Sequence, residues 1–268
     1  MSVVNYNIFI VNENLYNIGI CLSGGGALGL AHIGALQALE ENGIYPDMIS
    51  GSSMGSVIGM LYAAGYSPKE MKKMIVKEHL SNPLRLFDFR LFSRTGFSTH
   101  HTLRLLLQKY VPENDFSALK KKLAVCVVNL NKGKWEIIDS GQKLHDYVIA
   151  SSSIPMLYEA QEIDGQTYVD GGVLNNLPVE SLKPVCRRII GIDVVPYVEQ
   201  KKFDNRLSIM SAYIYLQNHS NSAERQKLCD DLIVVNSVEK YHIFNFNAYK
   251  EIIRSGYDCT IKYLKSIN

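Results

Sequence analysis

One serine of this 268-residue sequence stands where covalent chemistry is expected. Gly51-Ser52-Ser53-Met54-Gly55 reads G-x-S-x-G, between a short apolar run and a helical run at 56–64. A sharp turn between a strand and a helix lifts one serine hydroxyl clear of the backbone, and the helix N-terminus favours negative charge there. We therefore predict that Ser53 is a nucleophile on such an elbow, with Gly51 and Gly55 permitting close backbone approach.

Acyl transfer by a serine also needs donors for the oxyanion and a group that takes the proton. Gly24, Gly25 and Gly26 follow an apolar run and open a helix, so their N–H groups are the candidate donors. Asp170 follows a short apolar run and precedes Gly171 and Gly172, which makes it the candidate base.

None of the seven histidines occupies a glycine-flanked loop after a strand, so we expect a Ser-Asp dyad in place of a Ser-His-Asp triad. A carboxylate with an ordinary pKa near 3.9 is a poor base for a hydroxyl. Burial must therefore raise the pKa of Asp170 for the dyad to work. Asp170 as a simple turn residue is the alternative that the Asp-Gly pair alone would favour.

The elements that position these residues alternate along the chain. The order strand, glycine-rich turn, helix, strand, elbow, helix predicts an α/β fold with parallel strands under helices. Helices are expected over 28–42, 56–64, 70–79, 102–110, 144–152 and 208–228, with a last one ending near 264 and a short one after Pro178. Strands are expected over 17–23, 44–50, 123–129, 135–139, 159–163, 166–169, 188–195 and 232–235.

Two further features concern packing and domain organisation. Small residues in the first helix (Ala27, Gly29, Ala31 and Gly34) should let it pack closely on the sheet. We see no repeat and no firm domain boundary. One domain is therefore predicted for 1–268, with its motifs at about 18–195 and further helices and a strand at 196–268. Residues 1–16 are expected to form an edge strand or a loose arm.

Composition narrows the class of protein. Hydrophobic residues make up 47% and charged residues 20%, and the net charge of +2 carries no nucleic-acid footprint. Five scattered cysteines without metal-ligand spacing indicate reduced thiols and an intracellular, cytoplasmic protein. No signal peptide and no bilayer-spanning stretch are recognised, so membrane contact is expected to be peripheral. No metal or cofactor is expected.

Four motifs in order strongly resemble those of the patatin-like phospholipases and cover about 18–195. They are Gly24-Gly25-Gly26-x-x-Gly29 with 31–36, the G-x-S-x-G at 51–55, Ala150-Ser151-Ser152-x-Ile154-Pro155, and Tyr168-Val169-Asp170-Gly171-Gly172-Val173 running on to Asn176-Leu177-Pro178.

The resemblance implies a three-layer α/β/α fold, a Ser53–Asp170 dyad with Gly25 and Gly26 as main oxyanion donors, and hydrolysis of lipid acyl esters without a metal. It departs at Leu28, where the family usually carries arginine or lysine. A cation there would assist the oxyanion or make a structural contact, so its absence bears on headgroup preference and rate.

Several alternatives stay open at this point. Thioesterase or acyltransferase activity fits the same dyad, and so does a catalytically weak lipid-binding protein. A dinucleotide site matches G-x-G-x-x-G at 24–29 but lacks the acidic residue at the end of the second strand. The apolar and basic run Leu84–Phe97 is either a lid that contacts lipid or a buried segment.

Overall fold

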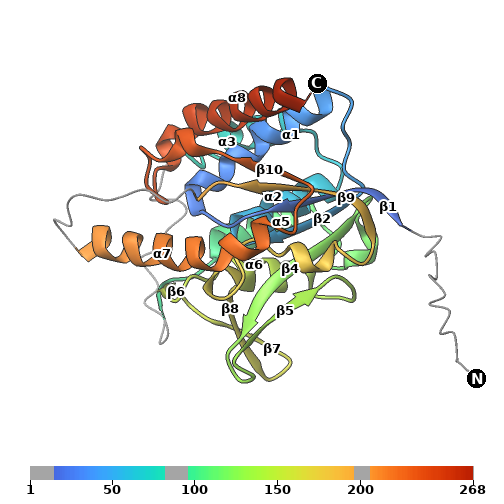
Figure 1. The fold of residues 1–268 in the computed structure, drawn as a ribbon. Helices are drawn as coiled ribbons and strands as arrows, with labels where there is room; N and C mark the ends of the chain where they lie inside the picture. Colours follow the sequence, from blue (N-terminus) through green and yellow to red (C-terminus); the bar gives the residue numbers. More distant parts are fainter. Residues whose placement is uncertain (1–14, 82–95, 196–205, 268) are drawn as a thin grey trace, which may run out of the picture.

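The computed structural model describes residues 15–81, 96–195 and 206–267, and a twisted eight-stranded sheet crosses its centre (Figure 1). The strand order is β10-β9-β1-β2-β4-β8-β7, and β5 pairs with β4 as well. The strands are β1 (Tyr16–Leu22), β2 (Met48–Ser52), β4 (Lys122–Asn129), β5 (Lys134–Ile138), β7 (Gln161–Ile163), β8 (Gln166–Asp170), β9 (Cys186–Asp193) and β10 (Asp231–Val234). A separate parallel pair joins β3 (Gly96–Ser98) to β6 (Met156–Tyr158).

The sheet is mostly parallel, as predicted. β1 pairs in parallel with β2 and β9, β9 with β10, and β2 with β4, whereas β5, β7 and β8 are antiparallel to their neighbours. The sheet has a hydrophobic core on each face, one larger than the other. Alternate residues of β1 point to opposite faces: Ile20 and Leu22 pack in the larger core, and Cys21 between them packs in the smaller one. Burial on both faces explains the near-continuous apolar runs of these strands.

Helices cover the two faces unequally. Those that contribute to the larger core are α1 (Ala31–Glu41), α2 (Met54–Ala63), α3 (Pro68–Lys77), α5 (His101–Tyr110), α6 (Leu144–Ser151) and α8 (Tyr249–Ile267). The smaller core is closed by the segment 177–186, which contains the 3-10 helix η4 (Val179–Ser181). Helix α7 (Arg206–Gln226) lies across the sheet from α8, α1 and α3 (Figure 1). The three-layer α/β/α fold is therefore confirmed.

Three local expectations need correction. The helix expected over 28–42 starts as the 3-10 helix η1 (Gly26–Leu30), and α1 begins only at Ala31. The helix after Pro178 is the single 3-10 turn η4. Gly34 packs against helix α8 and not against the sheet: a Cβ there would lie 1.8 Å from the carbonyl oxygen of Ile253.

Strand β4 brings the two halves of the motif set together. Ser52, at the end of β2, pairs with Cys126, and Asp170, at the end of β8, pairs with the next residue, Val127. Because β5 pairs with β4 over residues that overlap both partners, β2 and β8 share the other edge of β4. Two strands that run in opposite directions thus end against each other there, which places Ser53 beside Asp170.

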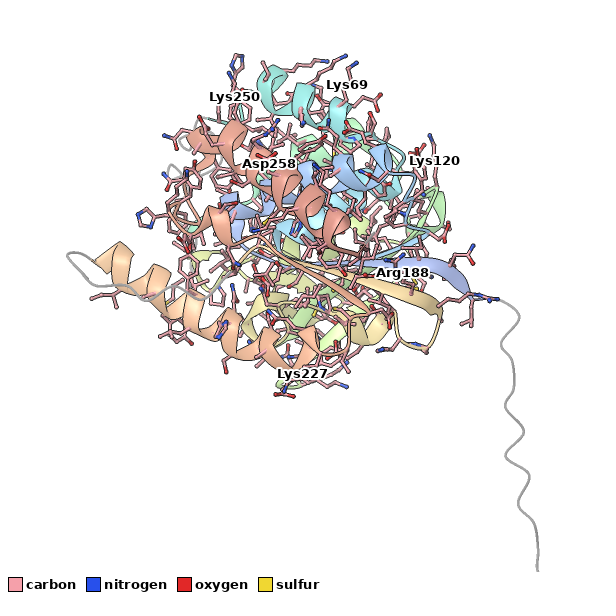
Figure 2. The ribbon with its side chains drawn as sticks, turned by 45° about the horizontal axis from the view of Figure 1, so that its top comes forward. Lys69, Lys120, Arg188, Lys227, Lys250 and Asp258 are labelled. Atoms are coloured by element: carbon pink, nitrogen blue, oxygen red, sulfur yellow. The ribbon has the colours of Figure 1, made fainter. Side chains whose placement is uncertain are left out.

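Other features of the described part of the chain concern its surface. The charged residues labelled in Figure 2 are spread over the surface: Lys250 and Asp258 belong to α8, and Lys69, Lys120, Arg188 and Lys227 come from other parts of the chain. Within the described residues, no helix has the length and apolar character needed to cross a bilayer. The run 84–97 falls almost wholly outside the described residues, with only Gly96 and Phe97 inside them, and 1–14 lie outside them too.

Candidate active site

Ser53 occupies a strained turn between β2 and α2. Its backbone dihedrals are φ 51° and ψ −127°, a conformation that L-residues rarely adopt, and it is the N-cap of α2. Its N–H donates to Ser151 Oγ (2.9 Å), and that hydroxyl donates to the carbonyl oxygen of Cys126 on β4 (2.7 Å). The elbow predicted from G-x-S-x-G is therefore present, and Ser151 braces it.

The two glycines of the elbow are required by close backbone contacts. A Cβ on Gly51 would lie 2.6 Å from the carbonyl of Gly55, and a Cβ on Gly55 would lie 2.2 Å from the carbonyl oxygen of Leu22. The first turn of α2 therefore packs directly on β1 and β2. Gly29 has the corresponding role against the side chain of Met54.

Asp170 lies within hydrogen-bond distance of the serine. The hydroxyl of Ser53 donates to Asp170 Oδ2 (2.6 Å), and the N–H of Gly172 donates to Asp170 Oδ1 (2.7 Å). Asp170 is only 4% exposed, and this burial raises its pKa from 3.8 to about 7, against the lowering effect of both hydrogen bonds. The raised pKa that a dyad requires is found.

The glycine-rich turn lies next to the dyad, but only part of it can meet a ligand. The N–H of Gly24 donates to the carbonyl oxygen of Asn176 (3.2 Å), so Gly24 is not an available donor, contrary to the sequence-based expectation. Gly25 (φ 153°) and Gly26 (φ 55°) have conformations that favour glycine, and both line the cavity with Ser53. Among the described residues, none accepts a hydrogen bond from either N–H.

A cavity of about 260 Å³ opens in front of Ser53 and Asp170. Small-molecule sites are commonly about 300–1,000 Å³, so this one lies near the lower end. Its walls are mainly apolar, with a few amides near the dyad. The lining side chains besides the dyad are Ile154, Pro155, Met156, Val173, Asn176, Tyr213, Ile214, Gln217, Asn218 and Ile243.

The histidines serve other contacts. His32 Nε2 is hydrogen-bonded to the carbonyl oxygen of Ser23 (2.8 Å), and burial lowers its pKa to about 4. His145 Nε2 is bonded to the carbonyl oxygen of Val111 (2.7 Å), and His100 stacks on Tyr158. All seven histidines belong to the described residues, and none lines the cavity.

The sequence also raises two questions: whether the residue at position 28 acts near the oxyanion, and whether the chain could hold a metal ion. Leu28 is fully buried in the larger core and is not among the described residues that line the cavity. Its side chain therefore does not reach the cavity in front of Ser53. Across 15–81, 96–195 and 206–267, no cluster of three or more His, Cys, Asp or Glu residues is suited to hold a metal ion.

Comparison with known proteins settles the family. The family model described as patatin-like phospholipase matches residues 20–183, which is more than half of the chain. The chain belongs to the patatin-like phospholipase family. The match spans the glycine-rich turn, the elbow and the Asp-Gly-Gly motif, so all the residues of the candidate site that precede α7 fall inside it.

Relatives among curated proteins are larger than this patatin-like chain. Lysophospholipase NTE1 of Candida glabrata is 28% identical over 278 residues, and the match covers 93% of this chain but 16% of that protein. A putative patatin-like phospholipase domain-containing protein of Caenorhabditis elegans is 25% identical, covering 91% of this chain and 25% of that protein. The chain thus spans a quarter or less of the length of these relatives.

Solved structures support the fold. Human GIVD cytosolic phospholipase A2 superposes with a TM-score of 0.55 at 12% identity, covering 95% of this chain and 59% of that one. VipD from Legionella pneumophila gives a TM-score of 0.52 at 17% identity, covering 94% of this chain and 67% of that one. At these identities the likeness concerns the fold alone.

Some residues of the site had no role assigned from the sequence. Ser151 lay inside a quoted motif, but its bond to the N–H of Ser53 depends on α6 packing against β4. Tyr213 and Asn218 line the cavity from α7, more than forty positions after Asp170, and nothing in their local pattern signals it. A helix of low charge after the last recognised motif was the available hint.

Proposed function

We propose that this patatin-like chain is a serine lipid acyl hydrolase that cleaves fatty-acyl ester bonds through an acyl-enzyme on Ser53. The observation that carries the proposal is the 2.6 Å hydrogen bond from Ser53 to a buried carboxylate whose pKa lies near neutrality. At neutral pH a substantial share of Asp170 is ionised and can accept a proton, yet it is basic enough to take one from an alcohol.

The dyad supplies both half-reactions. Ser53 Oγ attacks the ester carbonyl carbon while its proton passes to Asp170 Oδ2, and the carbonyl oxygen becomes an anion that the N–H groups of Gly25 and Gly26 stabilise. The carbon–oxygen bond to the alcohol then breaks, and the alcohol leaves with the proton from Asp170. Water next gives a proton to Asp170 and attacks the acyl carbon, and Ser53 leaves with that proton.

The cavity walls and the relatives together support a lipid substrate. Ile154, Pro155, Val173, Ile214 and Ile243 provide an apolar surface for an acyl chain beside the reacting serine. Similarity to proteins named lysophospholipase favours phospholipids with a single acyl chain, or related esters. We therefore propose lysophospholipids as the first substrates to test.

We also propose peripheral contact with a lipid surface through α7 and Met156. Ile209, Tyr213 and Leu216 follow one stripe of α7 and are 58%, 63% and 56% exposed, while Met156 is 69% exposed. Tyr213 and Met156 also line the cavity, so the exposed apolar side chains adjoin its opening. The stretch 209–221 contains no Asp, Glu, Lys or Arg. The free state of all five cysteines supports a cytoplasmic location.

The decisive experiment is hydrolysis of a lipid panel by wild type and Ser53→Ala. Lysophosphatidylcholine, diacyl phosphatidylcholine, triacylglycerol, an acyl thioester and a short p-nitrophenyl ester are incubated with each protein, and released fatty acid is quantified. We expect release from the acyl esters by wild type only, fastest from the single-chain phospholipid. Equal release by Ser53→Ala, or release from the thioester alone, would contradict the proposal.

A further inference from the structure

The side chain of Asn176 is buried in the candidate active site without a hydrogen-bond partner. It is 1% exposed and lines the cavity with Ser53 and Asp170. Among the described residues, none pairs with either its Oδ1 or its Nδ2 atom. Buried carboxamides are normally hydrogen-bonded, so an unpaired one at a reaction centre calls for a ligand.

The backbone fixes where this carboxamide lies. The carbonyl oxygen of Asn176 accepts the N–H of Gly24, which ties the residue to the oxyanion turn. A Cβ on Gly24 would lie 2.5 Å from Asn176 Oδ1 and 2.9 Å from the Cβ of Ser53. The carboxamide and the nucleophile therefore flank the same glycine.

A second asparagine approaches the same place from α7. A Cβ on Gly172 would lie 3.0 Å from Asn176 Oδ1, 3.1 Å from Asp170 Oδ1 and 3.2 Å from Asn218 Oδ1. Asn218 is 7% exposed and lines the cavity. Its position is fixed by its neighbours Gln217 and Asn221, which donate to the carbonyl oxygen of Val173 at 2.6 and 3.0 Å. The Oδ1 atoms of the two asparagines and of Asp170 thus approach one small space beside Gly172.

We propose that the carboxamides of Asn176 and Asn218 bind the oxygen of the departing alcohol and then the water that replaces it. An alcohol or water exchanges one proton with a carboxylate, and at a neighbouring carboxamide it can donate to the oxygen or accept from the N–H groups. Asp170 gives its proton to the alcohol as the ester bond breaks and takes one from the water as the water attacks. The amides hold that oxygen in line for both steps. The inference rests on the proposed acyl-enzyme route.

The test compares two butyrate esters that form the same acyl-enzyme. Departure of p-nitrophenolate needs no proton, whereas the glycerol of glycerol monobutyrate must be protonated. For Asn176→Leu we expect kcat/KM to fall about tenfold further on glycerol monobutyrate than on p-nitrophenyl butyrate. A tenfold decrease corresponds to the loss of about one net hydrogen bond in the transition state. Hydrolysis of the acyl-enzyme should also slow about tenfold, seen as a burst of p-nitrophenolate before a slower steady state.

Two further variants keep the test sound. Asn218→Leu, on a different element, should show the same selective loss, so a folding defect of one variant does not decide the matter. Asn175→Leu is the matched control, because Asn175 is equally buried but donates to Glu180 (3.0 Å) and lies outside the cavity lining. It should match wild type on the ratio between the two esters.

The outcomes separate the inference from the function on which it rests. Equal losses on both esters with unchanged hydrolysis of the acyl-enzyme would overturn the inference and assign Asn176 a structural role. Wild-type behaviour of both the Asn176 and the Asn218 variant would overturn it as well. If mass spectrometry shows no butyryl group on Ser53 of the wild type with either ester, the proposed function fails, and the inference fails with it.

Discussion

The hydroxyl of Ser53 donates a 2.6 Å hydrogen bond to Asp170 Oδ2, although 117 residues separate the two in the sequence. The contact depends on β4, because β2 and β8 end against consecutive residues of that strand. We predict that Ser53→Ala and Asp170→Asn each reduce ester hydrolysis to near background. The double variant should be little worse than either single one, since the two residues act as a unit.

A fluorophosphonate probe and thermal unfolding check this prediction. The probe should label wild type, fail on Ser53→Ala and react much more slowly with Asp170→Asn, while all variants unfold cooperatively. No single His→Ala change should match these losses, because none of the seven histidines lines the cavity. If a histidine variant folds normally but has no activity, the protein uses a Ser-His-Asp triad and not a dyad.

The pKa of Asp170 predicts how activity depends on pH. The base must be ionised to accept the proton of Ser53, so the rate should fall as the pH drops through about 7. The measurement is kcat/KM for a neutral short ester between pH 5 and 9. A rate that stays constant down to pH 5 would show that Asp170 does not act as the base.

The same pKa predicts the opposite trend for stability. A carboxyl whose pKa is raised on folding stabilises the native state below the unfolded pKa of 3.8, and this contribution is lost as the pH rises through about 7. Asp170→Asn should therefore unfold at a higher temperature than wild type at pH 8 and show less gain at pH 5. The limiting difference is about 4 kcal/mol. No gain at pH 8 would contradict a strongly raised pKa.

The oxyanion turn is tested best at Gly25. Gly26→Val would combine a strained backbone with a Cβ 2.4 Å from the carbonyl oxygen of Ile243, so it should cost stability as well as activity. Gly25 also has a positive φ (153°), but a Cβ there would meet side-chain atoms and no backbone: Val194 (2.9 Å), Val195 (3.0 Å) and Leu28 (3.6 Å). We expect Gly25→Ala to lower kcat about 100-fold or more, with a smaller effect on the unfolding temperature. Normal kcat in the folded variant would place the oxyanion donors elsewhere.

Ser151 gives a prediction about the support of the elbow. Ser151→Ala leaves the buried N–H of Ser53 without its acceptor, which should cost about 1–3 kcal/mol of unfolding free energy and lower kcat. Ser152→Ala is the control, since that hydroxyl bonds back to the carbonyl oxygen of Val148 in the preceding helical turn (3.1 Å) and not to the elbow. Denaturant unfolding and ester hydrolysis measure the two effects. If both variants show the same unfolding free energy and the same kcat, Ser151 does not support the elbow.

The α7 surface predicts a loss that depends on how the substrate is presented. Ile209→Gln with Leu216→Gln should weaken sedimentation with phosphatidylcholine vesicles and slow lipid hydrolysis, while hydrolysis of a short soluble ester stays within twofold. Val76→Gln, at a 59% exposed apolar position on α3, is the control and should change neither. Vesicle binding can be measured on Ser53→Ala, so the result is independent of turnover. If the double variant binds vesicles as well as the control does, this surface of α7 does not contact the lipid.

Much of the fold followed from local patterns. Runs such as 123–129 and the turn at Asp164-Gly165 predicted β4 and the β7–β8 hairpin to within two residues. The Ser53–Asp170 contact could be predicted because the residues of each motif specify the local turn that exposes its reactive side chain, and the motifs occur together in one order along the chain. The single-domain organisation remains a prediction.

What escaped the sequence depends on contacts between distant elements. The pattern around Gly34 shows only that something packs closely there, so it predicts the sheet as the partner, whereas the partner in the structure is α8. The pattern predicts an oxyanion donor at Gly24 because the acceptor of its N–H, the carbonyl oxygen of Asn176, comes from a distant segment of the chain. The cavity residues on α7, among them Tyr213 and Asn218, have no local signature. Tertiary packing decides which distant elements these residues contact, and the periodicity of a local sequence carries no information about that packing.

The meeting of β2 and β8 on β4 also makes the active site a reporter of folding. A shift of one residue in the pairing of β8 with β4 would send Asp170 to the opposite face of the sheet, away from Ser53. Fluorophosphonate reactivity should therefore appear only after β4 has gained both partners in register. Because pairings between distant segments form slowly, labelling at timed intervals during refolding would follow the arrival of the native sheet through a single covalent event.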